Sequence, residues 1–305
     1  MLGLILQQES HAAMIIVTGT KRSGTSMWMQ ILGAAGLQVF GAAFPKNWKD
    51  TIEGANPHGF FESPFRRGIY YATNPDPRTG IYIDPRPSAS LAVKVFIPGL
   101  CRTDLAFVRR VVATVRHWRE YASSIERLRE MEAASLREKR GPDWEPAPAL
   151  DPVVEWWLEN FALIRDIATR RYPAHVLTYE SVLERPAETL PPVLEWLGAP
   201  DIDAGVAVVS PKTRTQHRDQ LERHHEHDET FDALYDTIAT GEPLSGEFLE
   251  RLNETHLALL PQIEAEFARI ATERSSRRRR NAGSLLDPDL LESVVHGNHP
   301  ADEEE

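Results

Sequence analysis

Residues 14–30 read Met-Ile-Ile-Val-Thr-Gly-Thr-Lys-Arg-Ser-Gly-Thr-Ser-Met-Trp-Met-Gln, and their pattern is the strongest indication of the fold class. Its first four residues form an apolar, mostly β-branched run that is typical of a buried strand. Gly19 and Gly24 then bracket a short polar loop, and a helical pattern starts at Thr25. A strand, a glycine-bracketed loop and a helix together direct backbone N–H groups at a phosphate. The stretch therefore predicts an anion site suited to a nucleotide.

The loop differs from the ATP- and GTP-binding sequence in the placement of its cations. That sequence, G-x-x-x-x-G-K-[ST], has a Lys that reaches the β- and γ-phosphates and a hydroxyl that holds Mg²⁺. Gly19 and Gly24 keep its spacing, but Thr25 stands in the Lys position. Lys21 and Arg22 lie before the second glycine instead. This order favours a site in which fixed cations neutralise the phosphate.

A magnesium-dependent loop of this class also needs an Asp at the end of a second strand. The best later strand, residues 111–115, is followed by Arg116. The sequence therefore predicts a site without a metal. A Mg²⁺-dependent nucleotide kinase of the same loop class is the alternative enzyme, and an absolute requirement for Mg²⁺ would favour it.

The motif Arg22-Ser23-Gly24-Thr25-Ser26 resembles the 5′-phosphosulfate loop of the PAPS-dependent sulfotransferases, PAPS being 3′-phosphoadenosine-5′-phosphosulfate. The form with Arg is closer to the tyrosylprotein and bacterial branches than to the cytosolic branch, which usually has Lys there. The resemblance implies a three-layer α/β P-loop fold with a central parallel sheet. It also implies PAPS as the sulfuryl donor, bound in part by these five residues.

A second motif, Arg116-His117-Trp118-Arg119, follows the strand 111–115, and Ser124 lies eight residues after Arg116. Guanidinium groups suit phosphates because they form paired, directional hydrogen bonds. In the sulfotransferases an Arg at this strand end and a Ser in the next helix bind the 3′-phosphate, and Arg116 and Ser124 match them. Arg119 matches a frequent second Arg. Trp118 stands where the family usually has Pro.

A third segment resembles the family from residue 176 to residue 198. Its strand ends at Thr178, Tyr179-Glu180 is expected to begin the loop that follows, and a Pro-led helix ends in Leu197-Gly198. Tyr179 matches a residue that contacts the adenine in the family; a half-buried tyrosine at a strand end is the plain structural alternative. Lys212 and Arg214 stand where the family has a late basic loop that reaches the 3′-phosphate.

The general base is harder to assign from the sequence. Sulfuryl transfer needs an acceptor made nucleophilic and a cation near the bridging oxygen that takes up charge. Cytosolic sulfotransferases place a His two residues after a Lys, before a Leu-Pro pair. In Lys94-Val95-Phe96-Ile97-Pro98 that position holds Phe96, which cannot accept a proton. The cytosolic type of base is therefore absent, and a PAPS-binding or scaffold relative without catalysis is the alternative from another class.

Residues 56–62, Asn-Pro-His-Gly-Phe-Phe-Glu, resemble a Gly-aromatic-aromatic-Glu segment of bacterial members. Glu62 follows two aromatics that can desolvate it and so make it a useful base. We expect Glu62 to be the base, with His58 in reserve and a helix-start carboxylate as the structural alternative. Arg22 would stabilise charge on the bridging oxygen without donating a proton, and Lys21, if near, would donate one.

The composition of the chain limits the compartments and the classes of binding partner to be expected. The chain has 305 residues, seven Trp and a formal net charge of −11, which disfavours a nucleic-acid surface. The single cysteine, Cys101, excludes an intrachain disulfide and suits a reducing compartment. No stretch approaches the ~20 apolar residues that span a bilayer. These observations predict a cytoplasmic enzyme that binds neither membrane nor nucleic acid; its acceptor and its oligomeric state are not indicated.

The domain organisation follows from the same pattern. We expect residues 1–12 to be a leader or mis-assigned start, 13–274 a single domain, and 275–305 a charged, disordered tail. Strands are predicted over 14–17, 91–96, 111–115 and 175–178. Helices are predicted over 25–37, 103–110, 118–139, 152–171, 187–198, 217–239 and 245–274. Asp151 is the expected N-cap of the fourth of these, with Pro152 in its first turn. Residues 38–90 show no sustained period and are expected to form an ordered substrate region.

The alternation of strands and helices implies a parallel sheet with helices on both faces. Ligands then bind beyond the carboxyl ends of the strands, where the glycine-bracketed loop, Arg116 and Tyr179 all fall. Four histidines, His217, His224, His225 and His227, suggest a metal site. They lie among Arg and Glu without a nearby Cys, so a solvated charged face is favoured.

Overall fold

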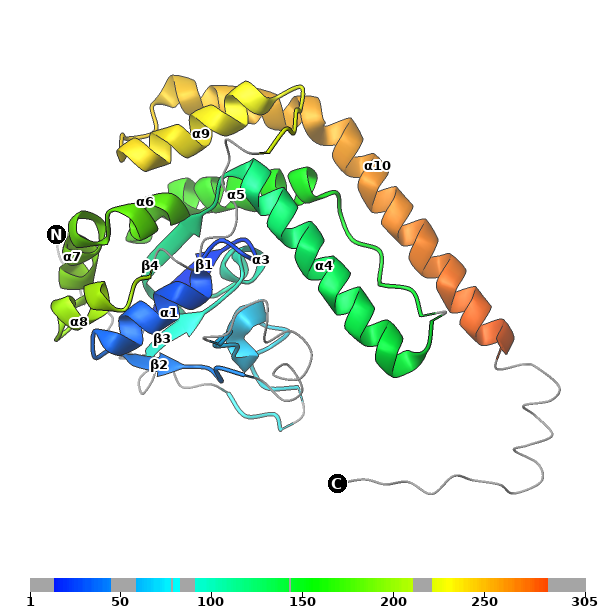
Figure 1. Cartoon of the computed structure of the whole chain (residues 1–305), viewed down its shortest axis with the longest axis horizontal. Helices are drawn as coiled ribbons and strands as arrows, with labels where there is room; N and C mark the ends of the chain where they lie inside the picture. Colours follow the sequence, from blue (N-terminus) through cyan, green and yellow to red (C-terminus); the bar gives the residue numbers. More distant parts are fainter. Residues whose placement is uncertain are drawn as a thin grey trace, which may run out of the picture.

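The computed structural model describes residues 14–44, 59–77, 79–82, 91–142, 144–210 and 221–284, with side chains through residue 277. A five-stranded parallel sheet in the order β2-β3-β1-β4-β5 forms its centre. The strands are β1 (Met14–Gly19), β2 (Gln38–Phe40), β3 (Leu91–Lys94), β4 (Val108–Val115) and β5 (Ala174–Thr178). Helices cover the sheet (Figure 1). The predicted α/β fold with a central parallel sheet is confirmed.

The central strand β1 pairs with β3 on one side and with β4 on the other, so that Ile16 lies opposite Val93 and Val111. All six of its residues are buried, which explains its continuous apolar run. Its side chains alternate between the two faces of the sheet: Ile15 packs into one core and Ile16 into the other.

One face of the sheet is covered by α1 (Thr25–Ala34), α6 (Tyr179–Glu184) and α7 (Pro186–Leu197), with α8 (Ile202–Ala207) packed beside α1 and α7. The other face packs against α3 (Ile97–Leu100) and α5 (Pro152–Arg170). The sheet is therefore the middle of three layers. The strand order reverses at β1, so the loops after β1 and β4 meet at the carboxyl edge, where ligands bind in open α/β sheets.

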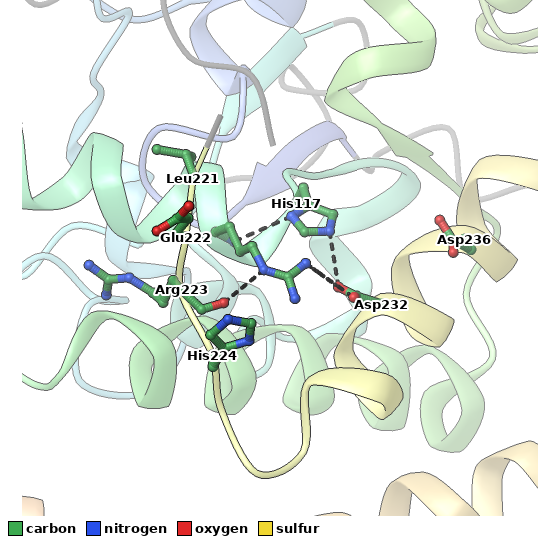
Figure 2. A pocket seen from close by; sticks show the side chains of 8 residues that line it. His117, Leu221, Glu222, Arg223, His224, Asp232 and Asp236 are labelled. Atoms are coloured by element: carbon green, nitrogen blue, oxygen red, sulfur yellow. Dashed lines mark hydrogen bonds and ion pairs between the residues drawn. The ribbon is translucent and has the colours of Figure 1, made fainter. Parts of the chain in front are cut away.

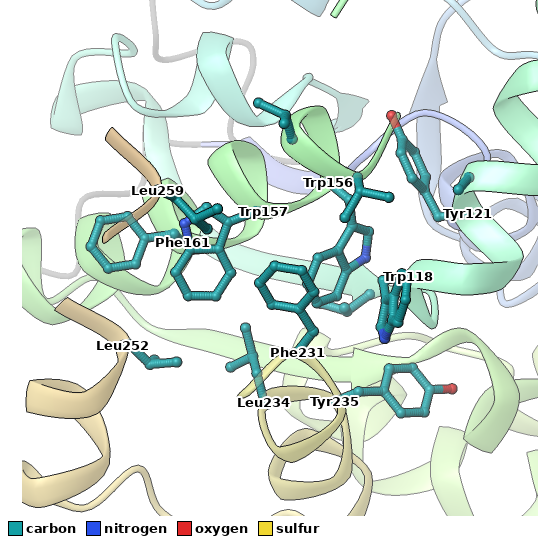
Figure 3. Packing of buried hydrophobic residues seen from close by; sticks show 14 of the residues in the cluster. Trp118, Tyr121, Trp156, Trp157, Phe161, Phe231, Leu234, Tyr235, Leu252 and Leu259 are labelled. Atoms are coloured by element: carbon teal, nitrogen blue, oxygen red, sulfur yellow. The ribbon is translucent and has the colours of Figure 1, made fainter. Parts of the chain in front are cut away.

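A second helical unit joins this core through α4 (Trp118–Arg140), α9 (Asp228–Thr240) and α10 (Gly246–Ser284). Its interior is rich in aromatic rings, and Figure 3 shows Phe231 among Trp118, Trp156 and Trp157. The ring centroid of Phe231 lies 5.8, 5.4 and 5.1 Å from those of the three tryptophans, respectively. This cluster fixes α9 against α4 and α5.

Asp151 caps α5 as the sequence predicts: its carboxylate accepts from the N–H groups of Val153 (2.8 Å) and Val154 (3.2 Å). The helix predicted over residues 103–110 is wrong. A single 3₁₀ turn, η4 (Leu105–Phe107), is followed directly by β4, because Val108 already pairs with Met14 of the central strand. Strand pairing with a buried neighbour overrides the local helical pattern.

Other expectations need smaller corrections. The segment after β5 is helical from Tyr179 rather than a loop, because the Thr178 hydroxyl accepts from the N–H of Ser181 at 3.2 Å. Strand β2 and the 3₁₀ turn η2 (Pro64–Arg67) lie in the stretch predicted to be irregular. Residues 221–227 precede α9 and are not helical.

Helix α10 continues through Ser284, so the first ten residues of the expected tail are helical. Arg277 donates to the carbonyls of Glu145 and Pro146 in the loop before α5. Residues 1–12 and 285–305 lie outside the described part. In the part that is described, no helix is both long and apolar enough to cross a membrane.

Candidate functional site

The loop between β1 and α1 is held closed by its own hydrogen bonds. The N–H and the hydroxyl of Ser23 both donate to the Thr20 carbonyl, at 3.2 and 2.7 Å. The Thr114 hydroxyl of neighbouring β4 donates to the Ser23 carbonyl at 2.9 Å. Gly24 is the N-cap of α1 with φ of 96°, and no described side chain caps the first turn. The N–H groups of that turn therefore remain available to an anion.

Arg22 links this loop to α4. Its Nε donates to the Ser124 hydroxyl at 3.2 Å, and its carbonyl accepts from Nη1 of Arg116 at 3.1 Å. Arg22 has φ of 67°, a left-handed conformation that is uncommon outside glycine. Burial and the nearby Arg116 guanidinium lower the pKa of Arg22. Two like charges held together in this way suit a multiply charged anion.

Arg116 is itself held firmly in place. Its Nε donates to Oε2 of Glu120 at 3.2 Å, and its guanidinium carbon lies 4.9 Å from the centroid of the Tyr179 ring. The indole N–H of Trp156 donates to the Arg116 carbonyl at 2.8 Å. A Cβ on Gly24 would lie 2.6 Å from Cδ2 of Tyr179, so the tyrosine ring packs directly on the loop. The structure thus brings together Arg22, Arg116, Ser124 and Tyr179, four of the residues singled out in the sequence.

Glu62 lies in a separate buried group. Its carboxylate is 2.7 Å from Nζ of Lys94, and the two side chains are 5% and 3% exposed. Lys94 also donates to the Ser26 hydroxyl at 3.3 Å and to the Phe60 carbonyl. Burial lowers the pKa of the Lys94 ammonium, and Glu62 opposes that shift. Oε2 of Glu62 is buried with no hydrogen-bond partner among the described residues.

Several predicted site residues lie elsewhere. Lys21 is exposed, and its charge partly offsets the rise that burial causes in the pKa of Glu132 on α4 and of Glu159 on α5. Arg119 faces α9, where its Nη1 lies 3.1 Å from Oδ2 of Asp232. Lys212, Arg214 and His58 lie outside the described residues.

Two further candidate residues, Lys94 and Glu120, were not predicted from the sequence. Lys94 is the cation that meets Glu62, and its signal was the Lys-x-Phe-x-Pro frame, which pointed to the position of a missing histidine rather than to the lysine. Glu120 is the buried partner of Arg116, and an i, i+4 pair spanning the start of a helix was its signal.

A pocket of about 400 Å³ opens between the start of α4 and the chain that leads into α9 (Figure 2). Its lining is mostly charged and polar: His117, Arg119, Leu221, Glu222, Arg223, His224, Asp232 and Asp236. Asp232 accepts from Trp118, which stands where the resembling family usually has Pro. The pocket thus adjoins the turn that follows Arg116.

Comparison with solved structures finds distant likenesses, one of which is to a sulfotransferase domain. The chain is similar to the solved sulfotransferase domain from the curacin biosynthetic pathway, with a TM-score of 0.38 and 14% sequence identity. The match covers 80% of this chain and 96% of that one. No protein-family model and no curated protein matches the sequence. A likeness at this level does not extend to chemistry or substrate.

Proposed function

We propose that the protein is a sulfotransferase that moves the sulfuryl group of PAPS to a hydroxyl or amine acceptor and releases adenosine 3′,5′-bisphosphate. The observation that carries this proposal is the link between the two loops: Arg22 donates to Ser124, and Arg116 donates to the Arg22 carbonyl. The loop after β1 and the turn after β4 thereby form one cationic site. It lies at the carboxyl edge of the sheet, where the strand order reverses.

The residues present suit a donor with two separate anionic groups. The uncapped first turn of α1 and residues 22–26 would hold the phosphosulfate. Arg116 and Ser124 would hold the 3′-phosphate, joined by Lys212 and Arg214, and Tyr179 would contact the adenine. A guanidinium forms paired bonds with phosphate oxygens, which explains the use of arginines where a magnesium-dependent loop has Lys and Asp.

The buried pair beside the loop supplies the remaining chemistry. A lone pair of the acceptor oxygen or nitrogen forms a bond to sulfur, while the bond between sulfur and the bridging oxygen breaks with its electron pair. Oε2 of Glu62, which has no hydrogen-bond partner among the described residues, takes the proton from the hydroxyl or amine that receives the sulfuryl group. Lys94 replaces Lys21 as the proton donor to the bridging oxygen, because burial lowers its pKa and Ser26 of the loop is its neighbour. Arg22 stabilises charge on that oxygen.

A thermal-shift experiment with adenosine 3′,5′-bisphosphate and ATP–Mg²⁺ side by side tests the cofactor assignment. A ligand at ~100 times its Kd adds roughly 2.7 kcal/mol to the free energy of unfolding. We expect the bisphosphate alone to raise the melting temperature, Arg116→Ala to abolish the rise, and the exposed-site control Arg185→Ala to retain it. Stabilisation by ATP–Mg²⁺ alone would overturn the proposal in favour of a nucleotide kinase.

A turnover assay tests the catalytic part. Transfer of labelled sulfate from PAPS to a panel of phenols, alcohols and amines should depend on Glu62, so Glu62→Gln should lose about 10²–10⁴-fold in rate, as for a general base. Unchanged turnover would remove Glu62 from the mechanism. Tight bisphosphate binding without transfer to any acceptor would instead identify a nucleotide-binding relative without catalysis.

A further inference from the structure

Helix α9 contacts the phosphate site at two points, although its sequence carries no motif of its own. Asp232, on α9, lies beside the turn that follows Arg116 (Figure 2). Three consecutive residues of that turn donate to its carboxylate. They are His117 through Nε2 at 3.0 Å, Trp118 through its indole N–H at 2.6 Å, and Arg119 through Nη1 at 3.1 Å.

The geometry of His117 fixes which of its nitrogens carries a proton. Its Nδ1 accepts from the backbone N–H of Arg119 at 3.3 Å as the N-cap of α4. Nε2 is therefore the donor toward Asp232. The side chains of these three residues thus share the Asp232 carboxylate, which is 35% exposed and borders the pocket. Arg119 has a second carboxylate on α9 within reach, because its Nη2 lies 3.7 Å from Oδ2 of Asp228.

The second contact lies one turn further along α9. The Tyr235 hydroxyl is 3.2 Å from Oε2 of Glu180, the residue directly after Tyr179. The Tyr235 ring also packs edge-on against His117, with centroids 5.0 Å apart. Asp232 and Tyr235 are three residues apart and so share one face of the helix. This face of α9 therefore contacts the residues that directly follow Arg116 and Tyr179 in the chain. Arg116 and Tyr179 are stacked on each other and border the loop between β1 and α1.

We propose that α9 is the positioning element of the phosphate site, with Asp232 as its principal residue. Asp232 fixes the turn after β4, and Tyr235 fixes the start of α6, so that Arg116 stays stacked on Tyr179 and keeps its bond to the loop. Phe231 anchors the helix for this role, because it is fully buried among the tryptophans of α4 and α5. The C-terminal helices are thus part of the site rather than an appendage to it. The inference rests on the proposed function only for the identity of the ligand.

The test compares Asp232→Asn with wild type and with Glu229→Gln. Asn preserves the shape of the side chain and removes its charge. Glu229 is exposed on the same helix, so its substitution changes the charge equally away from the turn. Calorimetric titration with adenosine 3′,5′-bisphosphate should show Kd raised about tenfold in Asp232→Asn, because charge-assisted hydrogen bonds are lost. In Glu229→Gln, Kd should change by less than about twofold.

A double-mutant cycle separates positioning from a general loss of structure. If Asp232 acts through Arg116, then Asp232→Asn causes no further loss in an Arg116→Ala background. A tenfold loss that persists in that background overturns the proposal, as does a Kd of Asp232→Asn equal to that of wild type. Where the bisphosphate no longer binds measurably to Arg116→Ala, Arg116→Lys serves as the background.

Hydrogen exchange without ligand supplies a readout that does not depend on the proposed reaction. The amides of residues 116–122 should exchange faster in Asp232→Asn than in wild type and Glu229→Gln, and equal rates overturn the proposal. Wild-type protein that binds ATP–Mg²⁺ but not the bisphosphate refutes the proposed function alone. The cycle is then measured with ATP–Mg²⁺, and the exchange result stands in either case.

Discussion

The ion pair between Glu62 and Lys94 makes a prediction whose size follows from its burial. The two charged atoms are 2.7 Å apart, and the side chains are 5% and 3% exposed. Removing one partner of such a pair leaves a buried charge without compensation, which costs about 3–5 kcal/mol. We expect Lys94→Met to lower the free energy of unfolding by this amount, because the Met side chain fills the space of the lysine stem but not its charge.

The double variant should behave differently. Replacing both members of a buried ion pair by groups without charge is often neutral or stabilising. The double variant, Lys94→Met with Glu62→Gln, should therefore lose much less free energy of unfolding than the two single variants lose in sum. The difference, which is the coupling energy, should be about 2–3 kcal/mol. Urea unfolding of all four proteins at one pH measures the coupling, provided that the slopes with denaturant agree.

Two results would refute this reasoning. Additivity of the single variants within about 0.5 kcal/mol would mean that the two groups do not interact in solution. A loss below about 1 kcal/mol in Lys94→Met would mean that the Glu62 carboxylate reaches water, in the range of an exposed pair. The second result would also weaken the assignment of Lys94 as proton donor, because that assignment depends on its burial.

Three further predictions concern the core, the loop and the pH dependence of stability. Phe231→Ala should lower the free energy of unfolding, measured in urea, by about 3–5 kcal/mol, because a fully buried ring is deleted. The control Phe267→Ala, at a 53% exposed site, should change it little, and equal losses would contradict the packing. Gly24→Ala should lower stability and nucleotide affinity more than Gly141→Ala does. Both glycines have a positive φ, but only at Gly24 would the added Cβ meet an aromatic ring. Equal effects of the two substitutions would argue against close packing at Gly24. The side chain of Glu159 is surrounded by protein although part of its surface still reaches solvent. Its burial, and next the Glu155 carboxylate, raise its pKa to about 8. The folded state therefore binds more protons than the unfolded chain, and stability falls as pH rises from about 4.5 to about 8. Melting curves should show Glu159→Gln stabilising the protein at pH ~9 and much less at pH ~5, and a benefit independent of pH would contradict the shift.

The local features of the fold could be predicted because each depends on neighbouring residues. The run from Met14 to Val17 carries enough apolar, β-branched character to specify a buried strand, and Asp151 before Pro152 specifies a helix start by its own hydrogen bonds. Strand β2 could not be predicted in the same way. It has three residues and depends on pairing with β3, more than fifty residues later in the chain.

The site was predictable only in part for the same physical reason. The residues of the glycine-bracketed loop are contiguous, so their spacing alone carries the signal. The pairing of Glu62 with Lys94 and of Trp118 with Asp232 joins residues that are far apart in sequence, and no local pattern encodes such distances. The predicted helix over 103–110 failed because the buried partner strand, rather than local propensity, decides where β4 begins.

The place of β1 in the sheet has a consequence for synthesis of the protein. The strand is made first among the five, yet its neighbours follow much later: Ile15 pairs with Ala92 and Arg110, roughly 75 and 95 residues further on. At translation rates of about 5–20 residues per second, this leaves an apolar segment with two unpaired edges for roughly 4–20 s. Such edges recruit other chains. Chaperone capture of the nascent chain should therefore begin at residues 14–19 and end once β4 has left the ribosome.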